Sequence, residues 1–467
     1  MTDNAKPATA PRRQMRLGAF LFGVGHHAAA WRHPDVDPQA PFRFDYWLDL
    51  ACKAEEAKFD AVFLADNVAL FGASAEAIAY TPPVYTGEPL TLLSALATHT
   101  SHIGLIATVS TTYLAPYHVA RKFAALDQLS GGRAGWNLVT SGSDAEAANF
   151  GLDRQLTHDN RYRIAAEHVE VVKALWDSFA DDAVIADKAS GRFYDPAKLR
   201  LVDHAGEHFR VRGPLQTGRP VQGHPVVVQA GSSEDGQKLA AATAELVFTA
   251  QQSRHASRAF VQGLKDKAEA LGRSRDDILV LPGVTIYVAP TREEAEAKLR
   301  KLHDFVDMGG ALQSIKTFLE WDLTGADLDA LPPPPPFTEG WQSRQKLFYD
   351  LALEEGLTVR QLVSRMSAAR GHLVLVGTPV EIVDQLEEWF ETGAADGFNI
   401  LAPTFPQGLD DVIAFVLPEL RRRGLFRTEY EGRTLRENLG LKRPGDGFAT
   451  ASADIGADIG ANTAFAR

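Results

Sequence analysis

The chain has 467 residues, of which 45% are hydrophobic and 23% are charged, so it can bury a large core and is neither a disordered segment nor a disulfide-stapled miniprotein. Its 48 basic and 60 acidic residues give a formal charge of −12, which argues against nucleic acid and anionic membrane surfaces as partners. A single cysteine excludes an intrachain disulfide and a cysteine-based metal site.

The chain begins with a segment, residues 1–14, that we expect to be a flexible N-terminus. It lacks the apolar core of a secretory signal, and no apolar run in the chain approaches the ~20 residues needed to span a bilayer. We therefore expect a cytoplasmic protein that has no membrane partner.

Residues 15–440 alternate short apolar runs with longer amphipathic stretches, the pattern of parallel strands joined by helices. We expect eight strands, at residues 15–22, 60–65, 103–108, 133–140, 225–230, 245–249, 278–288 and 397–401. We expect helices at about 42–58, 89–100, 116–129, 160–179, 233–243, 254–271, 291–306 and 408–424. Eight strand and helix pairs in alternation predict an α/β fold, namely a (β/α)₈ TIM barrel.

Two stretches, about 181–224 and 307–375, interrupt the repeat, and we expect them to be insertions at the carboxyl-end face of the barrel. Turn residues divide the first into short extended pieces. The second contains five consecutive prolines and two helical segments, and we interpret it as a lid because insertions at this face cover barrel active sites. The Ala-, Gly- and Asp-rich tail, residues 441–467, is expected to be disordered.

A glycine-rich loop at residues 23–28 follows the first expected strand and matches the dinucleotide fingerprint G-x-G-x-x-A. That fingerprint must open a helix, whereas prolines at positions 34, 38 and 41 prevent a helix here. We therefore expect a loop over the barrel mouth, where His26 and Trp31 belong to an aromatic and basic cluster. An ordinary surface loop is the alternative.

Polar side chains stand where three neighbouring strands are expected to end. They are Asp66, Thr108 and Asn137. Because strand ends converge at one mouth of a barrel, this set indicates hydrogen bonding to a polar heterocycle. Asp66 could instead cap a turn.

A phosphate site is indicated where the fifth expected strand runs into a helix. Ser232 and Ser233 stand at the start of that helix, where backbone N–H groups, the helix dipole and hydroxyls together attract anions. His158 and Tyr162, four positions apart on another expected helix, add donors. Helix capping by the serines remains the alternative. Zinc, EF-hand, P-loop and nucleophile-elbow motifs are absent, so we expect no metal and expect a cofactor to supply the reactivity.

The strings LGAFLFGVGHHAAAWR, FDAVFLADN, WNLVTS, THDNRY and VVVQAGSSEDGQKLAA resemble the bacterial-luciferase-like flavin-dependent monooxygenases. The branch resembled includes nitrilotriacetate monooxygenase component A, dibenzothiophene sulfone monooxygenase and the large subunit of pristinamycin synthase. The resemblance implies a two-component enzyme that receives reduced FMN (FMNH₂) from a separate NAD(P)H:flavin reductase. It implies that O₂ then forms a flavin C4a-peroxide, which oxygenates a small organic substrate and leads to cleavage of a C–N, C–S or related bond.

The resemblance also implies roles for individual residues. The FMN contacts fall on Asp66, Thr108, Asn137, His158, Tyr162, Ser232 and Ser233. The two serines, His158 and Tyr162 would hold the phosphate, and the other three would face the ring or the ribityl chain. His26, Trp31 and His372 are candidates for the substrate side, as catalytic residues. We further expect a homodimer or homotetramer. The alternatives are a deazaflavin-dependent oxidoreductase of the same superfamily and a noncatalytic flavin-binding protein.

Overall fold

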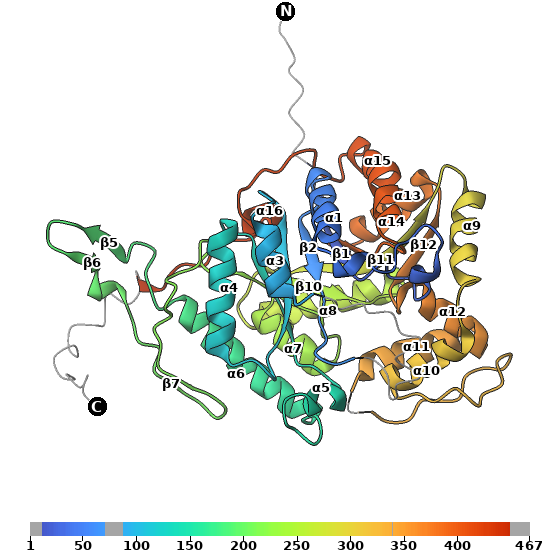
Figure 1. Cartoon of the computed structure of the whole chain (residues 1–467), viewed down its shortest axis with the longest axis horizontal. Coiled ribbons are helices and arrows are strands. Elements are labelled where there is room, and N and C mark those ends of the chain that lie inside the picture. The colour runs from blue at the N-terminus through green and yellow to red at the C-terminus, as the bar shows by residue number, and fades with distance from the viewer. Residues whose placement is uncertain (1–11, 71–86, 339, 449–467) are drawn as a thin grey trace, which may run out of the picture.

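Eight parallel strands close into a barrel in the computed structural model, which describes residues 12–70, 87–338 and 340–448 (Figure 1). In order around the barrel they are β1 (Arg16–Leu21), β2 (Ala61–Leu64), β3 (Gly104–Ser110), β4 (Ala134–Val139), β9 (Val226–Gln229), β10 (Leu246–Thr249), β11 (Leu279–Val288) and β13 (Gly397–Ile400). Arg16 on β1 lies opposite Gly397 on β13, and this pairing closes the ring. The predicted (β/α)₈ barrel is confirmed, and every expected strand is present.

The helices pack around the outside of the barrel, because each has an apolar stripe that the strands cover. They are α1 (Phe44–Glu56), α3 (Pro89–Ala97), α4 (Pro116–Ser130), α6 (His158–Trp176), α7 (Glu234–Thr243), α8 (Arg254–Ala270), α9 (Arg292–His303), α13 (Pro379–Glu391), α14 (Gln407–Asp411) and α15 (Leu417–Arg422), with short α5 (Asp144–Ala148) and α16 (Leu435–Leu439). A π-helical turn joins α14 to α15, which divides the helix expected at 408–424.

Helix α13 was not among the expected helices, although its sequence contains a start signal. Thr378 accepts a hydrogen bond from the backbone N–H of Glu381 and Glu381 accepts one in return, which is a capping box, and Pro379 follows the cap. The helix then buries Leu386 and Phe390 against the barrel.

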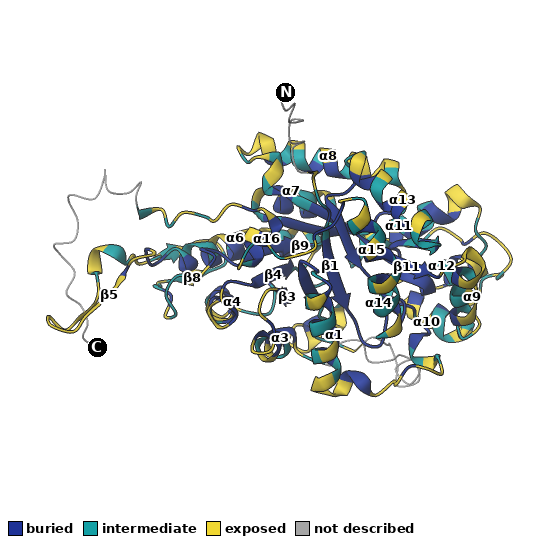
Figure 2. Cartoon of the chain, turned by 90° about the horizontal axis from the view of Figure 1, so that it is seen from above, coloured by how far each residue is buried: buried dark blue, intermediate teal, exposed yellow. Residues whose placement is uncertain are grey.

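The first insertion, residues 181–224, forms two antiparallel hairpins that we call the arm. In it, β5 (Val184–Asp187) pairs with β6 (Arg192–Tyr194), and β7 (His204–Ala205) pairs with β8 (Arg210–Val211). Strands β5 and β6 are exposed along their whole length and project away from the barrel (Figure 2). The arm follows helix α6 rather than a strand, so the chain does not leave the barrel at a strand's carboxyl end.

The second insertion, residues 307–375, lies at the opposite end of the molecule from the arm, and we call it the lid segment (Figures 1 and 2). It contains α10 (Met308–Leu319), α11 (Gln342–Glu355) and α12 (Val359–Ala369), which share a hydrophobic core of their own. Strand β12 (Leu373–Gly377) follows and pairs in parallel with the second half of β11. The sequence predicted α11 and α12, whereas α10 and β12 were not expected.

Both ends of the described chain contact the barrel or the arm. Arg12 forms ion pairs with Glu387 and Glu391 on α13. Arg443 forms an ion pair with Asp181, and the Phe448 ring lies 4.1 Å from the Arg200 guanidinium carbon. Residues 1–11 and 449–467, on which parts of the N-terminal and tail predictions fall, lie outside the described residues. None of the described helices is long and apolar enough to cross a membrane.

Candidate active site

A cavity of about 1230 Å³ lies between the carboxyl ends of the barrel strands and the lid segment. All ten residues selected from the sequence line it, namely His26, Trp31, Asp66, Thr108, Asn137, His158, Tyr162, Ser232, Ser233 and His372. Among the described residues, the arm supplies no part of its lining. Of the two insertions, only the lid segment therefore adjoins the candidate site.

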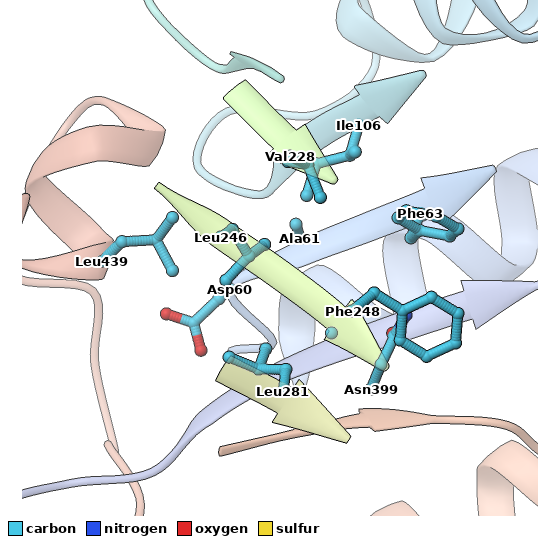
Figure 3. Close-up of a pocket in the computed structure, with 11 residues that line it drawn as sticks. Asp60, Ala61, Phe63, Ile106, Val228, Leu246, Phe248, Leu281, Asn399 and Leu439 are labelled. Carbon is cyan, nitrogen blue, oxygen red and sulfur yellow. The ribbon is translucent and has the colours of Figure 1, made fainter. Parts of the chain in front are cut away.

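Two phenylalanines form the floor of this cavity. The rings of Phe63 on β2 and Phe248 on β10 have centroids 5.5 Å apart, and both rings line the large cavity and a small one of about 20 Å³ inside the barrel. Figure 3 shows the small cavity, with Phe63 and Phe248 at the end toward which the strands point and Asp60 at the other. The floor is apolar, so polar groups in the large cavity are confined to its walls.

Thr108 and Asn137 form a buried hydrogen-bonded pair on the strand-end wall. They lie opposite each other on β3 and β4, and Asn137 Nδ2 donates to Thr108 Oγ1 at 2.8 Å. The Asn137 Oδ1 atom is buried and has no hydrogen-bond partner within the described part of the chain. A buried carbonyl oxygen without a donor costs free energy, so this atom favours a ligand that brings an N–H or O–H group.

Asp66 lies on the same wall, just after β2, and is half-buried. Burial, with a smaller effect of the negative charges of Glu88 and Glu146, raises the pKa of Asp66 to about 6. Its Oδ1 atom accepts a hydrogen bond from the backbone N–H of Asn67, which acts in the opposite direction. Asp66 therefore caps a local turn and also adjoins the cavity. The two interpretations of this residue, as a turn cap and as a residue of the barrel mouth, are compatible.

The turn after β9 brings backbone close to the cavity. A Cβ atom on Gly231 would lie 2.5 Å from Gln229 Nε2 and 2.9 Å from Tyr162 Oη, so a larger residue there would displace these two side chains. Ser233 is the N-cap of α7, and its hydroxyl accepts a hydrogen bond from Gly236 N at 3.1 Å. Ser232 Oγ does not cap the helix and lies 3.2 Å from Thr249 Oγ1. The capping role of Ser233 still leaves its hydroxyl proton free to be donated to an anion.

Helix α6 supplies a second group of polar side chains to this part of the cavity. The rings of His158 and Tyr162 have centroids 4.8 Å apart, as their spacing on one helix face predicts, and His158 Nδ1 lies 3.4 Å from Asp235 on α7. Between them in sequence, Arg161 is only 2% exposed and also lines the cavity. His158, Tyr162 and the N-terminus of α7 thus adjoin one corner of the cavity, and Arg161 adds a buried cation elsewhere in its lining, near Gly142.

All three candidates for the substrate side line the large cavity, two of them as buried histidines and one in the loop after β1. His26 is buried, stacks on Phe22 with centroids 5.0 Å apart, and donates from Nε2 to the Phe20 carbonyl at 2.9 Å. Burial lowers the pKa of His26 to about 3, so the ring is neutral at pH 7 with its free lone pair on Nδ1.

Trp31 lies half-buried in the loop after β1, and among the described residues no α-helix precedes Phe44. The rejection of a dinucleotide fingerprint in this loop is confirmed.

His372 belongs to the lid segment and lies between α12 and β12. Its ring stacks on Phe248 with centroids 5.0 Å apart, and burial lowers its pKa well below the usual range. Its Nδ1 atom is buried and has no hydrogen-bond partner among the described residues. His372 is therefore a neutral side chain with one unsatisfied nitrogen next to the apolar floor.

Comparison with known proteins identifies the family. Residues 15–396 match the family model of the luciferase-like monooxygenases. The chain belongs to this family. It is 47% identical to nitrilotriacetate monooxygenase component A of Aminobacter aminovorans, over 94% of this chain and 99% of the relative. It is 45% identical to N-acetyl-S-(2-succino)cysteine monooxygenase of Bacillus subtilis, over 94% of this chain and 100% of the relative.

The fold agrees with this assignment. The crystal structure of DmoA from Hyphomicrobium sulfonivorans matches with a TM-score of 0.84 at 32% identity, over 96% of this chain and 97% of that one. The chain is thus a flavin-dependent monooxygenase of the luciferase-like family, as the sequence motifs predicted.

Sequence reasoning missed most of the wall that the lid segment contributes to the cavity of this monooxygenase. Trp341 just before α11, Arg344 on α11 and Arg370 just after α12 line that wall. Most of the other candidates were found at the ends of predicted strands, whereas no described strand directly precedes Trp341 or Arg344. Arginines in a polar insertion are also most often exposed to solvent, so the local sequence offers no reason to place them at the cavity. Their role depends on how three helices fold over the barrel, which no local motif encodes.

Proposed function

We propose that this monooxygenase binds FMN as FMNH₂ in the large cavity and uses O₂ to oxygenate a small organic substrate, with cleavage of a C–N, C–S or related bond. The observation that supports this most is the convergence of seven candidate FMN contacts on one cavity, from five elements far apart in the sequence. Bound FMNH₂ supplies the electrons with which O₂ is activated. Everything else in the reaction is a task for the protein's own side chains.

The strand-end wall is suited to the flavin ring. The unpaired Asn137 Oδ1 can accept a hydrogen bond from a ring N–H, and Thr108 is held beside it. Asp66 adjoins the same wall and would face the ring or the ribityl chain.

The corner formed by α6 and the start of α7 is suited to the phosphate. Ser232 and Ser233 offer hydroxyl protons at a helix N-terminus, His158 and Tyr162 adjoin the same turn, and Arg161 lines the same cavity. Helix N-termini and cations together favour a dianionic group.

The lid segment and the neutral histidines have a different task. Activated oxygen is lost to water as H₂O₂ unless the site excludes solvent, so the cavity needs an apolar cover. Phe318 and Trp341, with ring centroids 4.2 Å apart, supply such a cover from the lid segment. His26 and His372, being neutral, can accept or donate a hydrogen bond to the substrate without placing a second charge beside it.

We also propose that a separate NAD(P)H:flavin reductase supplies the reduced flavin. One relative is named as component A, which implies a further component for that protein, and the loop after β1 in this chain forms no nicotinamide-binding helix. The purified chain should therefore oxidise no NADH with FMN present, and should oxygenate its substrate only after any competent flavin reductase is added. Rapid NADH oxidation by the chain alone would contradict this.

The relatives' names leave the substrate open. Nitrilotriacetate carries three carboxylates, whereas dimethyl sulfide, named for another relative, is uncharged. A small organic molecule is the class that the cavity accommodates.

The decisive experiment is stopped-flow mixing of the protein–FMNH₂ complex with O₂. We expect a transient absorbance that differs from those of reduced and oxidised FMN and outlasts the autoxidation of free FMNH₂. Direct conversion to oxidised FMN at the rate of the free flavin would refute oxygen activation. Parallel titrations with FMN and a deazaflavin would separate the proposed enzyme from the deazaflavin-dependent alternative.

We further propose self-association into a homodimer or homotetramer through the arm. Val184 and Phe193, on paired strands, are each 57% exposed, and a two-stranded hairpin is marginally stable without a covering surface. Val184→Lys with Phe193→Lys should lower the mass measured by light scattering and leave FMN binding unchanged. An unchanged mass would exclude the arm as the contact.

A further inference from the structure

Arg344 is a lid arginine of the cavity wall that forms no ion pair with an acid among the described residues and makes one hydrogen bond there, to a backbone carbonyl. Its Nη1 atom donates to the carbonyl of Arg370 at 2.8 Å, and no carboxylate in the described ranges forms an ion pair with it. Burial alone lowers the pKa of Arg344 to about 10, so the guanidinium is still charged at pH 7. The side chain is half-buried in the cavity wall. A partly desolvated cation without a counter-ion is unfavourable, and an incoming anion relieves that cost.

The arginines of the same segment that face away from the cavity are satisfied differently. Arg360 forms an ion pair with Asp329 at 3.1 Å, and Arg365 forms one with Glu355 at 2.8 Å. Neither lines the cavity. The lid segment thus pairs its outward arginines with acids and leaves the guanidinium of Arg344 at the cavity without one.

The backbone beneath Arg344 is shaped to hold the guanidinium there. Arg370 ends α12 with φ of 53° and Gly371 follows with φ of 88°, both in the left-handed region. A Cβ atom on Gly371 would lie 2.8 Å from Arg344 Nη1, so the glycine is needed for the guanidinium to pack. The side chain of Arg370 also lines the cavity, with its guanidinium carbon 4.9 Å from the centroid of Phe22.

We infer that Arg344, with Arg370 beside it, binds a carboxylate of the substrate, so that the substrates of this enzyme are small organic acids. The inference rests on the proposed function and specifies it. A planar guanidinium matches a carboxylate with two parallel hydrogen bonds, which fixes the orientation of the acid as well as its affinity. The FMN phosphate has its own candidate corner between α6 and α7, formed by other residues. The carboxylate would instead lie near the neutral rings of His26 and His372, whose pKa values the charges of Arg370 and Arg344 lower further.

The test uses a matched pair of probes, thiodiacetate and its uncharged diamide, titrated by calorimetry into the full-length protein with and without oxidised FMN. We expect the unmodified protein to bind thiodiacetate at least about tenfold more tightly than the diamide. Arg344→Gln should abolish most of that preference, and Arg344→Lys should retain part of it, because an ammonium keeps the charge but loses the two-point geometry. Arg360→Gln removes the same charge outside the cavity and should change nothing.

Three results would overturn the inference. The first is no preference for the charged probe in the unmodified protein, including no binding of either probe. The second is a preference that survives Arg344→Gln. The third is an Arg344→Gln variant that binds FMN more weakly but riboflavin normally, because Arg344 would then hold the phosphate. FMN binding and the stopped-flow transient are measured on the same variants, so a failure of the proposed function itself would be seen separately.

Discussion

The two walls of the large cavity differ in origin and in charge. The strand-end wall consists of hydrogen-bonding groups and an acid, with Asn137 Oδ1 unpaired and the pKa of Asp66 raised by burial and by nearby acids. The lid wall presents aromatic rings and the guanidinium groups of Arg344 and Arg370, beside other polar residues that include Asp307 and Asp350. There burial, and to a lesser extent the arginine charges, lower the pKa of buried histidines. The difference indicates that one wall is built to hold the cofactor and the other to select and enclose the substrate.

The largest effect should come from removing the lid wall. If residues 307–371 are replaced by a Gly/Ser linker, β12 is kept and the strand-end wall is untouched. We expect FMNH₂ affinity to stay within roughly tenfold, about 1.4 kcal/mol. H₂O₂ should replace product as the fate of most of the O₂ consumed, because the site is no longer closed to water. Oxygen uptake and peroxide release, measured together, give the coupling.

A single substitution tests the same role of the lid wall in case the deletion variant does not fold. Trp341→Ala removes one ring of the cover, since Trp341 packs on Phe318 at the cavity, and leaves the remaining lid core in place. It should also raise peroxide release, to a smaller extent. Full coupling of O₂ to product in both folded variants would mean that the lid wall has no role in enclosing the reaction.

The next effect concerns the phosphate corner of the strand-end wall. The double change Ser232→Ala with Ser233→Ala should raise the Kd for FMN by about a hundredfold or more, because two charge-assisted hydrogen bonds of ~1.5–3 kcal/mol each are at stake. The Kd for riboflavin, which lacks the phosphate, should change little. Fluorescence titration with both ligands measures the difference.

The structure allows the two serines to be separated. Ser233 caps α7, so Ser233→Ala should also lower the free energy of unfolding by ~0.5–2 kcal/mol, whereas Ser232→Ala should not. Ser253→Ala is the matched control, because Ser253 caps α8 outside the cavity. It should lower stability by a similar amount and leave FMN affinity intact. Equal weakening of FMN and riboflavin would place the phosphate elsewhere.

A smaller effect is expected for the ring side of the same wall. Asn137→Ala removes the unpaired acceptor and the donor to Thr108. A neutral hydrogen bond contributes about 1 kcal/mol, so FMN and riboflavin should both bind about fivefold more weakly. The equal loss for the two ligands distinguishes this site from the phosphate corner. A loss confined to FMN would show that Asn137 does not face the ring.

The contrast between the walls also explains what the sequence could predict. Asp66, Thr108 and Asn137 were identifiable because a parallel barrel brings the carboxyl ends of its strands together, whatever the loops do. The pairing of Thr108 with Asn137 follows from neighbouring strands, and that of His158 with Tyr162 follows from helix geometry. Local rules of this kind fix both the place and the contact.

The lid wall follows no such rule. Arg344 reaches the cavity because α10, α11 and α12 share a core and because Gly371 admits the guanidinium, and both are tertiary facts. Strand β12 was missed because it pairs only with the extension of β11 beyond the barrel. It is therefore not part of the strand and helix repeat from which the other strands were predicted. The position of the exposed arm could not be predicted for the same reason. The arm follows helix α6 and not a strand, and it therefore contributes no described residue to the cavity lining.

The smallest effect tests whether the walls are electrostatically separate. The pKa of Asp66 is about 6 when folded and near 3.8 when unfolded, so between about pH 4 and pH 6 the folded protein binds more protons than the unfolded chain. Stability therefore falls as pH rises through this window, and Asp66→Asn should remove that part of the fall. Denaturant unfolding should show Asp66→Asn about 1 kcal/mol more stable than the unmodified protein at pH 7.5, after allowance for partial exposure, and equal to it at pH 3.5. If the variant were instead less stable at pH 7.5, a cation such as Arg344 or Arg370 would be stabilising the carboxylate across the cavity. The two walls would then share one charge network, and an organic acid would have to compete with Asp66 for the guanidinium groups.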